Sequence, residues 1–462
     1  MQTTPTSRRA ELLGNSVRRL LRRKARNKIS KLLEKERPED VAVMLRGLIP
    51  GEQFAIFKIL SEDFPDAASD VLVSMEPQGR MAIFEQLNPE QVAQILEVAA
   101  VDDAIFMLDG LPEELKEKVL EIVDIEDRFA DVQEHLGYRD ETAGRIMDSE
   151  FLAMEEETTA AEAITRLREM ARDVEMISYL YVVDGNGRLA GVTPLRNLLL
   201  ADAGDTLGEL MNTSLIKVNT DTDQEEVAQL AARYDLLAIP VIDEEDRLAG
   251  IVTVDDILDV FKEEATEDFY KMAGTSDEEL VYQDRSLKVA GIRLPWILFN
   301  LIGLLGAGFV TTRFEQTFDI ALLIGFIPVI MGMAGNIGSQ TSTIAVRGLA
   351  TGRLSHEQGR IATFLWQQFK VGAVLGVTCS SLVAVVAYVF ERDPKVAFVV
   401  GGALFLTVQL ASLTGVLIPM VAYRFGYDPA VASGPLVTTA NDVLGLLIYF
   451  GLAYVLFQSL PG

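Results

Sequence analysis

The sequence predicts a multi-domain protein with an all-α superhelical N-terminal domain, a pair of α/β domains, an acidic connecting helix and a transmembrane domain of five α-helices. Three observations support this fold class: charge is uneven along the 462 residues, a strand–turn–strand motif occurs twice, and long uncharged stretches fill the last third. The predicted segments, in chain order, are 1–37, 38–140, 141–207, 208–254, 255–289 and 290–462.

Charge is concentrated in particular segments, although the whole chain has a net charge of −27. Residues 1–37 carry 12 basic and 3 acidic side chains, and residues 291–462 carry 9 and 7. Residues 38–290 hold the remaining 20 basic and 58 acidic side chains. This excess of negative charge opposes a compact state unless cations bind. The alternative is that the acids only provide solubility or suit a salty cytoplasm.

The basic segment 1–37 has apolar residues at roughly helical spacing among its bases. These are Val17, Leu20, Leu21, Ile29, Leu32 and Leu33. Such a segment either lies on the anionic inner leaflet of a membrane or forms a solvated basic arm. The pattern leaves both interpretations open.

Residues 38–140 have the pattern of a stack of short helices. Prolines recur at positions 50, 65, 77, 89 and 112, and several are followed by Glu or Gln. Proline at the first helical position, with acids in the first turn, marks a helix start. Apolar residues then follow at helical spacing, as in Val92, Ile95, Leu96 and Ala99. We expect an acidic helical array without a catalytic constellation.

An internal repeat lies in residues 141–254. The segment 181–192 reads YVVDGNGRLAGV, and 240–251 reads PVIDEEDRLAGI. Each copy predicts two strands joined by an acidic turn, and a helical stretch precedes each copy, at 160–170 and 224–234. This repeat resembles a pair of CBS domains, which pack together and often bind adenosine nucleotides.

The resemblance to CBS domains implies a nucleotide site in the second copy. In that family a Ser or Thr after the second strand, and an Asp three residues later, hold a ribose. Thr253 and Asp256 match these positions, whereas the first copy has Pro194 and Asn197. Tyr179 is a further candidate contact for an adenine nucleotide such as ATP.

Residues 255–289 predict an acidic connecting helix followed by a linker. Its carboxylates are spaced by four residues: Asp255, Asp259, Glu263 and Glu267, and again Glu264 and Asp268. Like charges at this spacing repel by about 0.2–0.5 kcal/mol per pair. The helix is either a solvated face or a cation-binding surface. Its position between the acidic region and the first apolar stretch favours cation binding.

Five apolar stretches follow, each long enough to cross about 30 Å of hydrocarbon. They are 294–312, 320–346, 371–390, 396–423 and 430–458. The connection between the second and third carries four bases: Arg347, Arg353, Arg360 and Lys370. Positive-inside bias places this connection and the N-terminal half in the cytoplasm, and the C-terminus outside. We therefore expect a multi-pass protein of the cell membrane, in contact with lipid.

Asp442 is the only charged residue of the last apolar stretch, with Asn441 and Thr438 beside it. A carboxylate at the centre of a membrane helix costs about 2.5–3.5 kcal/mol on insertion scales, so it usually faces a water-filled path or a partner. In the second stretch Asn336 and Gln340 lie four residues apart, on one helical face. We expect these residues to line a pore. The alternatives are an ion pair for Asp442 and close helix packing for the amides.

The ligands available for a metal are mainly oxygen atoms. The chain has one cysteine, Cys379, and two histidines, which excludes an intrachain disulfide and argues against a zinc site. Carboxylate, amide and hydroxyl oxygens suit Mg²⁺, which keeps several of its waters. Acids in the soluble half are candidate regulatory ligands: Asp102, Asp103, Asp255, Asp256, Asp259, Glu263, Glu264 and Glu267, together with Asp428 before the last span.

The order of these segments and two membrane motifs resemble the MgtE family of magnesium transporters. Residues 335–340 read GNIGSQ, and 434–445 read GPLVTTANDVLG. Ala334 replaces a glycine that is usual in the family. The resemblance implies a homodimer with its pore on the two-fold axis, a divalent ion at Asp442, and a cytosolic gate closed by Mg²⁺.

The sequence therefore predicts a Mg²⁺-selective, Mg²⁺-gated, channel-like transporter for magnesium uptake. It contains no nucleophile–base pair and no phosphate-binding glycine loop, so we expect neither an enzyme nor a nucleic-acid partner. Two alternatives stay open: a cation-coupled divalent exchanger, and a nucleotide-responsive membrane sensor that transports nothing.

Overall fold

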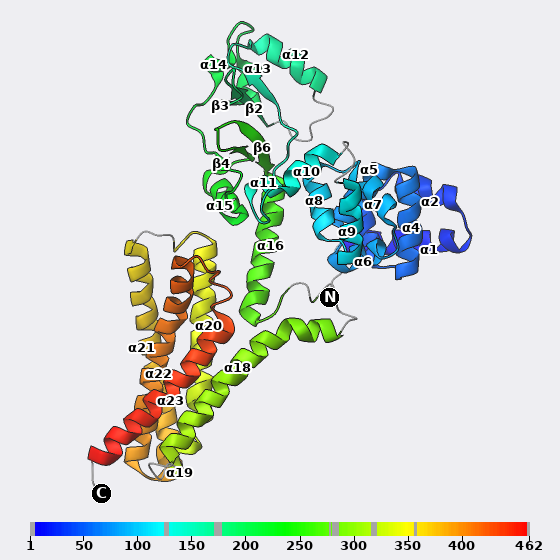
Figure 1. Cartoon of the computed structure of the whole chain (residues 1–462). Helices are drawn as coiled ribbons and strands as arrows, with labels where there is room; N and C mark the ends of the chain where they lie inside the picture. Colours follow the sequence, from blue (N-terminus) through cyan, green and yellow to red (C-terminus); the bar gives the residue numbers. More distant parts are fainter. Residues whose placement is uncertain are drawn as a thin grey trace. The chain divides into compact units, whose positions relative to one another are not determined.

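The computed structural model describes residues 5–123, 129–170, 178–276, 279, 286–315, 321–354 and 358–459. The chain divides into two compact units, Met1–Lys262 and Glu263–Gly462. The first contains a helical array and two small sheets, and the second contains the long apolar helices (Figure 1). The predicted fold class is confirmed in these respects.

The helical array consists of short helices, several of which begin at a proline, as the sequence predicts. Because Pro has no backbone N–H and a fixed φ, it fits the first helical position without loss of a hydrogen bond. Asn88 and Gln91 form a capping box before α7, with Asn88 Oδ1 accepting from Gln91 N at 2.8 Å. The helices are α1 (Pro5–Arg22), α2 (Arg26–Leu33), α3 (Pro38–Arg46), α4 (Pro50–Asp63), α5 (Pro65–Ser74), α6 (Pro77–Phe84), α7 (Pro89–Leu96), α8 (Val101–Asp109), α9 (Glu113–Val123) and α10 (Ala130–Leu136).

The described part of the basic segment packs into this array, so neither interpretation of its apolar residues was right. Val17 on α1 is 0% exposed and Ile29 on α2 is 1% exposed, and both belong to the core of the array. Arg18 Nε bonds to Glu52 on α4 at 3.0 Å. The apolar face of α1 and α2 is buried against α3 and α4, because the array offers a complementary apolar surface. The bases stay outside.

The repeat forms two sheets of the same topology. In each, a parallel pair is followed by an antiparallel hairpin, giving the orders β1-β2-β3 and β4-β5-β6. The strands are β1 (Ala153–Glu155), β2 (Tyr179–Val183), β3 (Leu189–Pro194), β4 (Val218–Asn219), β5 (Ala238–Ile242) and β6 (Leu248–Thr253). The associated helices are α11 (Ala143–Ile146), α12 (Ala160–Met170), α13 (Leu195–Leu200), α14 (Leu207–Leu210), α15 (Gln224–Tyr234) and α16 (Val254–Ala273).

The two copies pack against each other through their hairpins. Leu189 N donates to Asp246 O at 3.1 Å, and Leu248 N donates to Gly187 O at 3.2 Å. Gly187 and Asp246 occupy equivalent turn positions, and both have positive φ angles, 79° and 64°. This left-handed backbone is accessible to Gly and tolerated by Asp, which explains why the two turns can differ in sequence.

The described part of the second unit contains five long helices, of which α22 packs against three others. They are α18 (Ser286–Glu315), α20 (Ile327–Ala350), α21 (Gln358–Glu391), α22 (Pro394–Arg424) and α23 (Gly434–Ser459), with the short α19 (Ala321–Ile324) before α20. The helices α20, α21 and α23 pack on α22, and α23 also contacts α18 and α20. Large apolar side chains such as Ile302 and Phe390 are 69% and 75% exposed, as lipid-facing residues are.

Among the described residues, four helices are long and apolar enough to cross a membrane: α18, α21, α22 and α23. The predicted count of five spans is therefore not confirmed. The second stretch, expected at 320–346, is divided by a turn at Gly325 and Phe326, and α20 extends to Ala350. The described helix α20 does not meet the same combination of length and hydropathy, and its buried face packs on α22 and α23. The chain is a multi-pass membrane protein.

Candidate ion-binding sites

Asp442 lies in the first half of α23, and its side chain is partly buried. Within the described ranges, no hydrogen bond or ion pair joins its carboxylate to another side chain, so no basic residue neutralises it there. Thr438 lies one turn earlier, where its hydroxyl donates to Gly434 O at 3.1 Å. Because residues four apart share a helical face, Asp442 and Thr438 present oxygen atoms on one side of α23.

Asn336 and Gln340 lie on α20, four residues apart, and both are exposed. The two helices approach closely beside them: a Cβ at Gly335 would lie 3.4 Å from the Thr438 methyl group. No hydrogen bond joins either amide to Asp442 among the residues that the structure describes. The structure thus leaves two amides uncovered on a helix that packs beside the one carrying Asp442.

Asn441 points elsewhere. It is 1% exposed, and its Oδ1 accepts a hydrogen bond from Thr414 Oγ1 on α22 at 2.6 Å. Its Nδ2 has no hydrogen-bond partner among the described residues and lies against Gly338 of α20. The side chain is therefore inside the bundle, and the structure does not bring it together with Asp442, Asn336 and Gln340 as a pore-lining group.

Two further polar residues contact the last span, and sequence reasoning missed both. Thr414 bonds to Asn441, and Asn300 on α18 accepts from Thr439 Oγ1 at 2.8 Å. The signal for Asn300 was available, because it is the only Asn or Gln in the stretch 294–312. No comparable signal distinguished Thr414, because α22 contains several other polar residues.

In the first unit, Asp102 on α8 and Asp256 on α16 share a hydrogen bond. The pKa of each carboxyl is raised, mainly by burial and then by neighbouring carboxylates. Asp256 also accepts from Thr253 N at 3.1 Å and from the Thr253 hydroxyl. Asp103 is the next residue on α8, and its charge contributes to the raised pKa of Asp102. The structure therefore brings acids of the helical array and the second repeat together.

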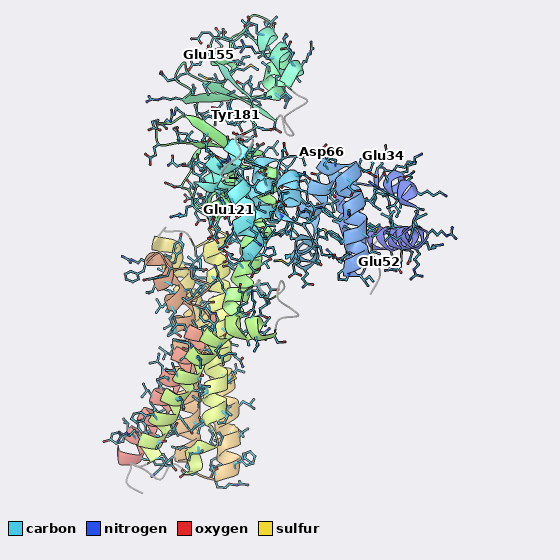
Figure 2. The ribbon with its side chains drawn as sticks, turned by 45° about the vertical axis from the view of Figure 1, so that its right-hand side comes forward. Glu34, Glu52, Asp66, Glu121, Glu155 and Tyr181 are labelled. Carbon is cyan, nitrogen blue, oxygen red and sulfur yellow. The ribbon has the colours of Figure 1, made fainter. Side chains whose placement is uncertain are left out.

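The other candidate regulatory acids on α16 are more exposed. Asp255 is exposed and accepts from Thr253 Oγ1 at 2.6 Å, and Asp259 is exposed and pairs with Lys262 at 2.5 Å. Glu263 is exposed and Glu264 is partly buried. Figure 2 shows other acids, such as Glu34, Glu52, Asp66 and Glu121, spread over the helices of the array.

In the second unit, the end of α16 meets the segment before α23. Lys271 Nζ lies 2.7 Å from Asp428 Oδ2 and 2.5 Å from Glu267 Oε1. Burial, and then the Asp428 charge, raise the pKa of Asp268 to about 6, and Lys271 opposes this shift. A lysine thus neutralises two of the candidate metal ligands in this structure. Within the described ranges, no three His, Cys, Asp or Glu side chains form a metal-site group.

A small pocket between the two repeats is lined by residues of both copies. Its lining includes Tyr179 from the first copy and Thr253 from the second, which are two of the three candidate nucleotide contacts. Tyr181, also in the lining and labelled in Figure 2, is 2% exposed, and its hydroxyl has no hydrogen-bond partner within the described residues. Asp256, the third candidate contact, is not in the lining of this pocket.

Three protein-family models match the chain in the order of these elements. They are the MgtE intracellular N domain at 36–141, the CBS domain at 143–204 and 207–263, and the MgtE divalent cation transporter at 327–452. The second unit therefore matches a transporter model over the region that contains α20 and α23.

Whole-chain relatives agree with these matches. The magnesium transporter MgtE of Thermus thermophilus is 36% identical over 97% of this chain and 99% of its own length. The Bacillus subtilis MgtE is 33% identical over 93% and 94%. A crystal structure of the cytosolic domain of the Mg²⁺ channel MgtE with ATP is 36% identical and covers 54% of this chain and 99% of its own, with a TM-score of 0.50. The chain therefore belongs to the MgtE family.

Proposed function

We propose that this protein is a Mg²⁺-selective, channel-like transporter that takes up magnesium across the cell membrane. The observation that carries the proposal is Asp442, a carboxylate without a basic partner among the described residues, on the 26-residue apolar helix α23. A charge at this depth is too costly to face lipid, and it marks an ion pathway by default. The magnesium transporters to which the chain is similar support Mg²⁺ as the ion.

The exposed amides of α20 support a homodimer. Asn336 and Gln340 are uncovered in the single chain, although apolar lipid cannot satisfy their hydrogen bonds. A second copy that faces this surface would enclose them, with two Asp442 carboxylates, around a polar path. Two such charges balance one Mg²⁺, and amide and hydroxyl oxygens can bind the waters that the ion keeps.

The test is Mg²⁺ flux into proteoliposomes, with Asp442→Asn beside wild type. The Asn side chain keeps the shape and removes the charge, so we expect flux to fall by at least about tenfold, the effect of about 1.4 kcal/mol. Asp393→Asn is the matched control, because Asn can replace Asp393 as the N-cap of α22. Near-normal flux in Asp442→Asn would end the proposal. Flux that requires a sodium or proton gradient would indicate an exchanger instead.

The acidic N-terminal half is proposed to lie in the cytoplasm and to close the pore when Mg²⁺ binds. Divalent ions between acidic faces would favour the closed state by their differential affinity for it. Asp259→Ala/Glu263→Ala/Glu267→Ala should therefore leave flux less inhibited by cytoplasmic Mg²⁺. Mg²⁺ should also protect the wild-type N-terminal half from protease more than that of the variant. If neither flux nor protease sensitivity of the wild-type protein changes with Mg²⁺, the acidic residues contribute only to solubility and the gating proposal is wrong.

ATP is proposed to bind at the CBS pair, in the pocket beside Tyr179 and Thr253. The pocket lining and the ATP complex of the similar cytosolic domain support this site. Isothermal titration of ATP into the full-length protein should give weaker binding in Asp256→Ala than in wild type, because Asp256 would hold the ribose. Equal affinity in both proteins would reject the assignment.

A further inference from the structure

Helix α23 is fastened to two neighbouring helices by side-chain hydrogen bonds at Thr439 and Asn441. Thr439 Oγ1 donates to Asn300 Oδ1 of α18 at 2.8 Å. Asn441 Oδ1 accepts from Thr414 Oγ1 of α22 at 2.6 Å. Both bonds join residues far apart in sequence, and both lie within three residues of Asp442.

The spacing of these bonds restrains the rotation of the helix. Successive residues of an α-helix are turned by about 100°, so Thr439 and Asn441 point to nearly opposite sides of α23, about 160° apart. Asp442 then lies about 60° from Thr439 and about 100° from Asn441 around the axis. A turn of α23 that changes the direction of Asp442 must therefore lengthen or break at least one of the two bonds.

The junction at Asn441 is also closely packed. Asn441 is 1% exposed, and its Nδ2 lies against Gly338, where a Cβ would collide with it. A Cβ at Gly415, the residue after Thr414, would lie 2.7 Å from Gly338 O. Three helices thus meet where only glycines leave room. The Asn441 Nδ2 is buried and has no hydrogen-bond partner among the described residues, which costs free energy. An apolar side chain would fill the same space without this cost, so packing alone does not explain the amide.

We propose that Thr414 and Asn300 are positioning residues of the permeation site: through Asn441 and Thr439 they set the direction in which Asp442 projects, and thereby the selectivity among divalent ions. This inference rests on the proposed role of Asp442 as the ion-binding group. Neither Thr414 nor Asn300 needs to touch the ion. Their effect would be geometric, because discrimination between Mg²⁺ and a larger ion depends on where the carboxylates are held.

The test compares Thr414→Val with Thr414→Ser in the full-length protein in proteoliposomes. Valine keeps the shape and removes the hydroxyl, and serine restores it. We measure the half-saturating Mg²⁺ concentration and the Mg²⁺/Ca²⁺ flux ratio per folded protein. Thr414→Val should change the ratio by about threefold, the factor for an interhelical hydrogen bond of average strength in a membrane, and Thr414→Ser should stay near wild type. Asn300→Leu should act in the same direction.

Thr378→Val is the matched control, because among the described residues the Thr378 hydroxyl donates to Val374 O of its own helix, at 2.8 Å, and to no other helix. A variant with less folded protein but an unchanged ratio would show that Thr414 only stabilises the bundle, and it would overturn the inference. Asp442→Asn in the same assay separates the two proposals. If Asp442→Asn keeps flux, the proposed function fails; if it loses flux while Thr414→Val matches wild type, only the positioning role fails.

Discussion

Replacing Asp102 by Asn should stabilise the Mg²⁺-free protein, although it removes a candidate metal ligand. Asp102 and Asp256 share a hydrogen bond, so their carboxyl groups lie close together in a partly buried contact. Two unit charges about 4 Å apart would repel by about 4 kcal/mol at an effective dielectric constant of 20, so the shared hydrogen bond requires that one of the two carboxyl groups holds a proton. Holding that proton above the ordinary pKa of Asp costs free energy in the folded state, and Asn removes this cost. Partial exposure screens the interaction, and we expect a gain of about 1–2 kcal/mol in the free energy of unfolding.

The expected temperature change follows from that energy. For a domain of this size, 1 kcal/mol shifts the unfolding temperature by roughly 2–4 °C. Calorimetry of the full-length protein in EDTA should therefore show the transition of the N-terminal half raised by about 2–8 °C in Asp102→Asn. Added Mg²⁺ should raise it further in wild type and less in the variant, because the variant has lost both a ligand and the repulsion that the ion relieves.

The pH dependence gives an independent check. The pKa of Asp102 is raised in the folded protein, mainly by burial and then by Asp256. The folded state thus holds this proton more tightly than the unfolded state, and stability falls as the pH rises from about 4 through the raised value. Asp102→Asn should reduce that decline. Asp221→Asn, at an exposed carboxylate, is the control. A lower unfolding temperature of Asp102→Asn in EDTA, or an unchanged Mg²⁺ increment, would refute the reasoning.

Three further changes test other parts of the structure. Ile29→Ala should lower the unfolding free energy by about 2–4 kcal/mol, whereas Lys28→Ala at the exposed neighbour should change it by less than about 0.5 kcal/mol; equal effects would contradict the packing of α2. Asp109→Asn removes the carboxylate that Arg145, 8% exposed, bonds at 2.8 Å, and should cost about 1–3 kcal/mol in chemical denaturation; no loss would mean that water replaces the pair. Gly338→Ala should reduce Mg²⁺ flux, because its methyl group meets the buried amide on α23; normal flux would mean that the helices separate freely.

Much of the fold was predictable because it depends on local patterns. The helices α12 (Ala160–Met170) and α15 (Gln224–Tyr234) have the bounds that the apolar spacing predicts. The two hairpins follow from alternating strands around acidic turns, in which Asp184 and Asp243 each accept from backbone N–H groups two and four residues ahead. These interactions act within a few residues, so one segment of sequence contains all the information that they need.

Predictions that depended on the surroundings of a segment were less successful. The bases and apolar residues of 1–37 predict an amphipathic helix, but the sequence does not show which surface covers the apolar side. The array covers it, and Val17 and Ile29 are buried there. In the same way, the turn at Gly325 divides an apolar stretch that composition alone presents as continuous. An apolar pattern predicts that one face of a helix is buried. It does not identify the surface that covers this face, because that surface comes from elsewhere in the chain.

The sequence by itself determined the fold class, the repeat, and Asp442 as the one charge in its apolar stretch, because these follow from composition and periodicity. Only the tertiary structure decided that Asn441 turns inward to Thr414, that Asn300 holds Thr439, and that the acids of α8 and α16 meet at Asp102 and Asp256. The physical reason is that these contacts join residues 27, 139 and 154 positions apart. A hydrogen bond or a charge contact at such separations depends on how whole helices pack, and no local pattern encodes it.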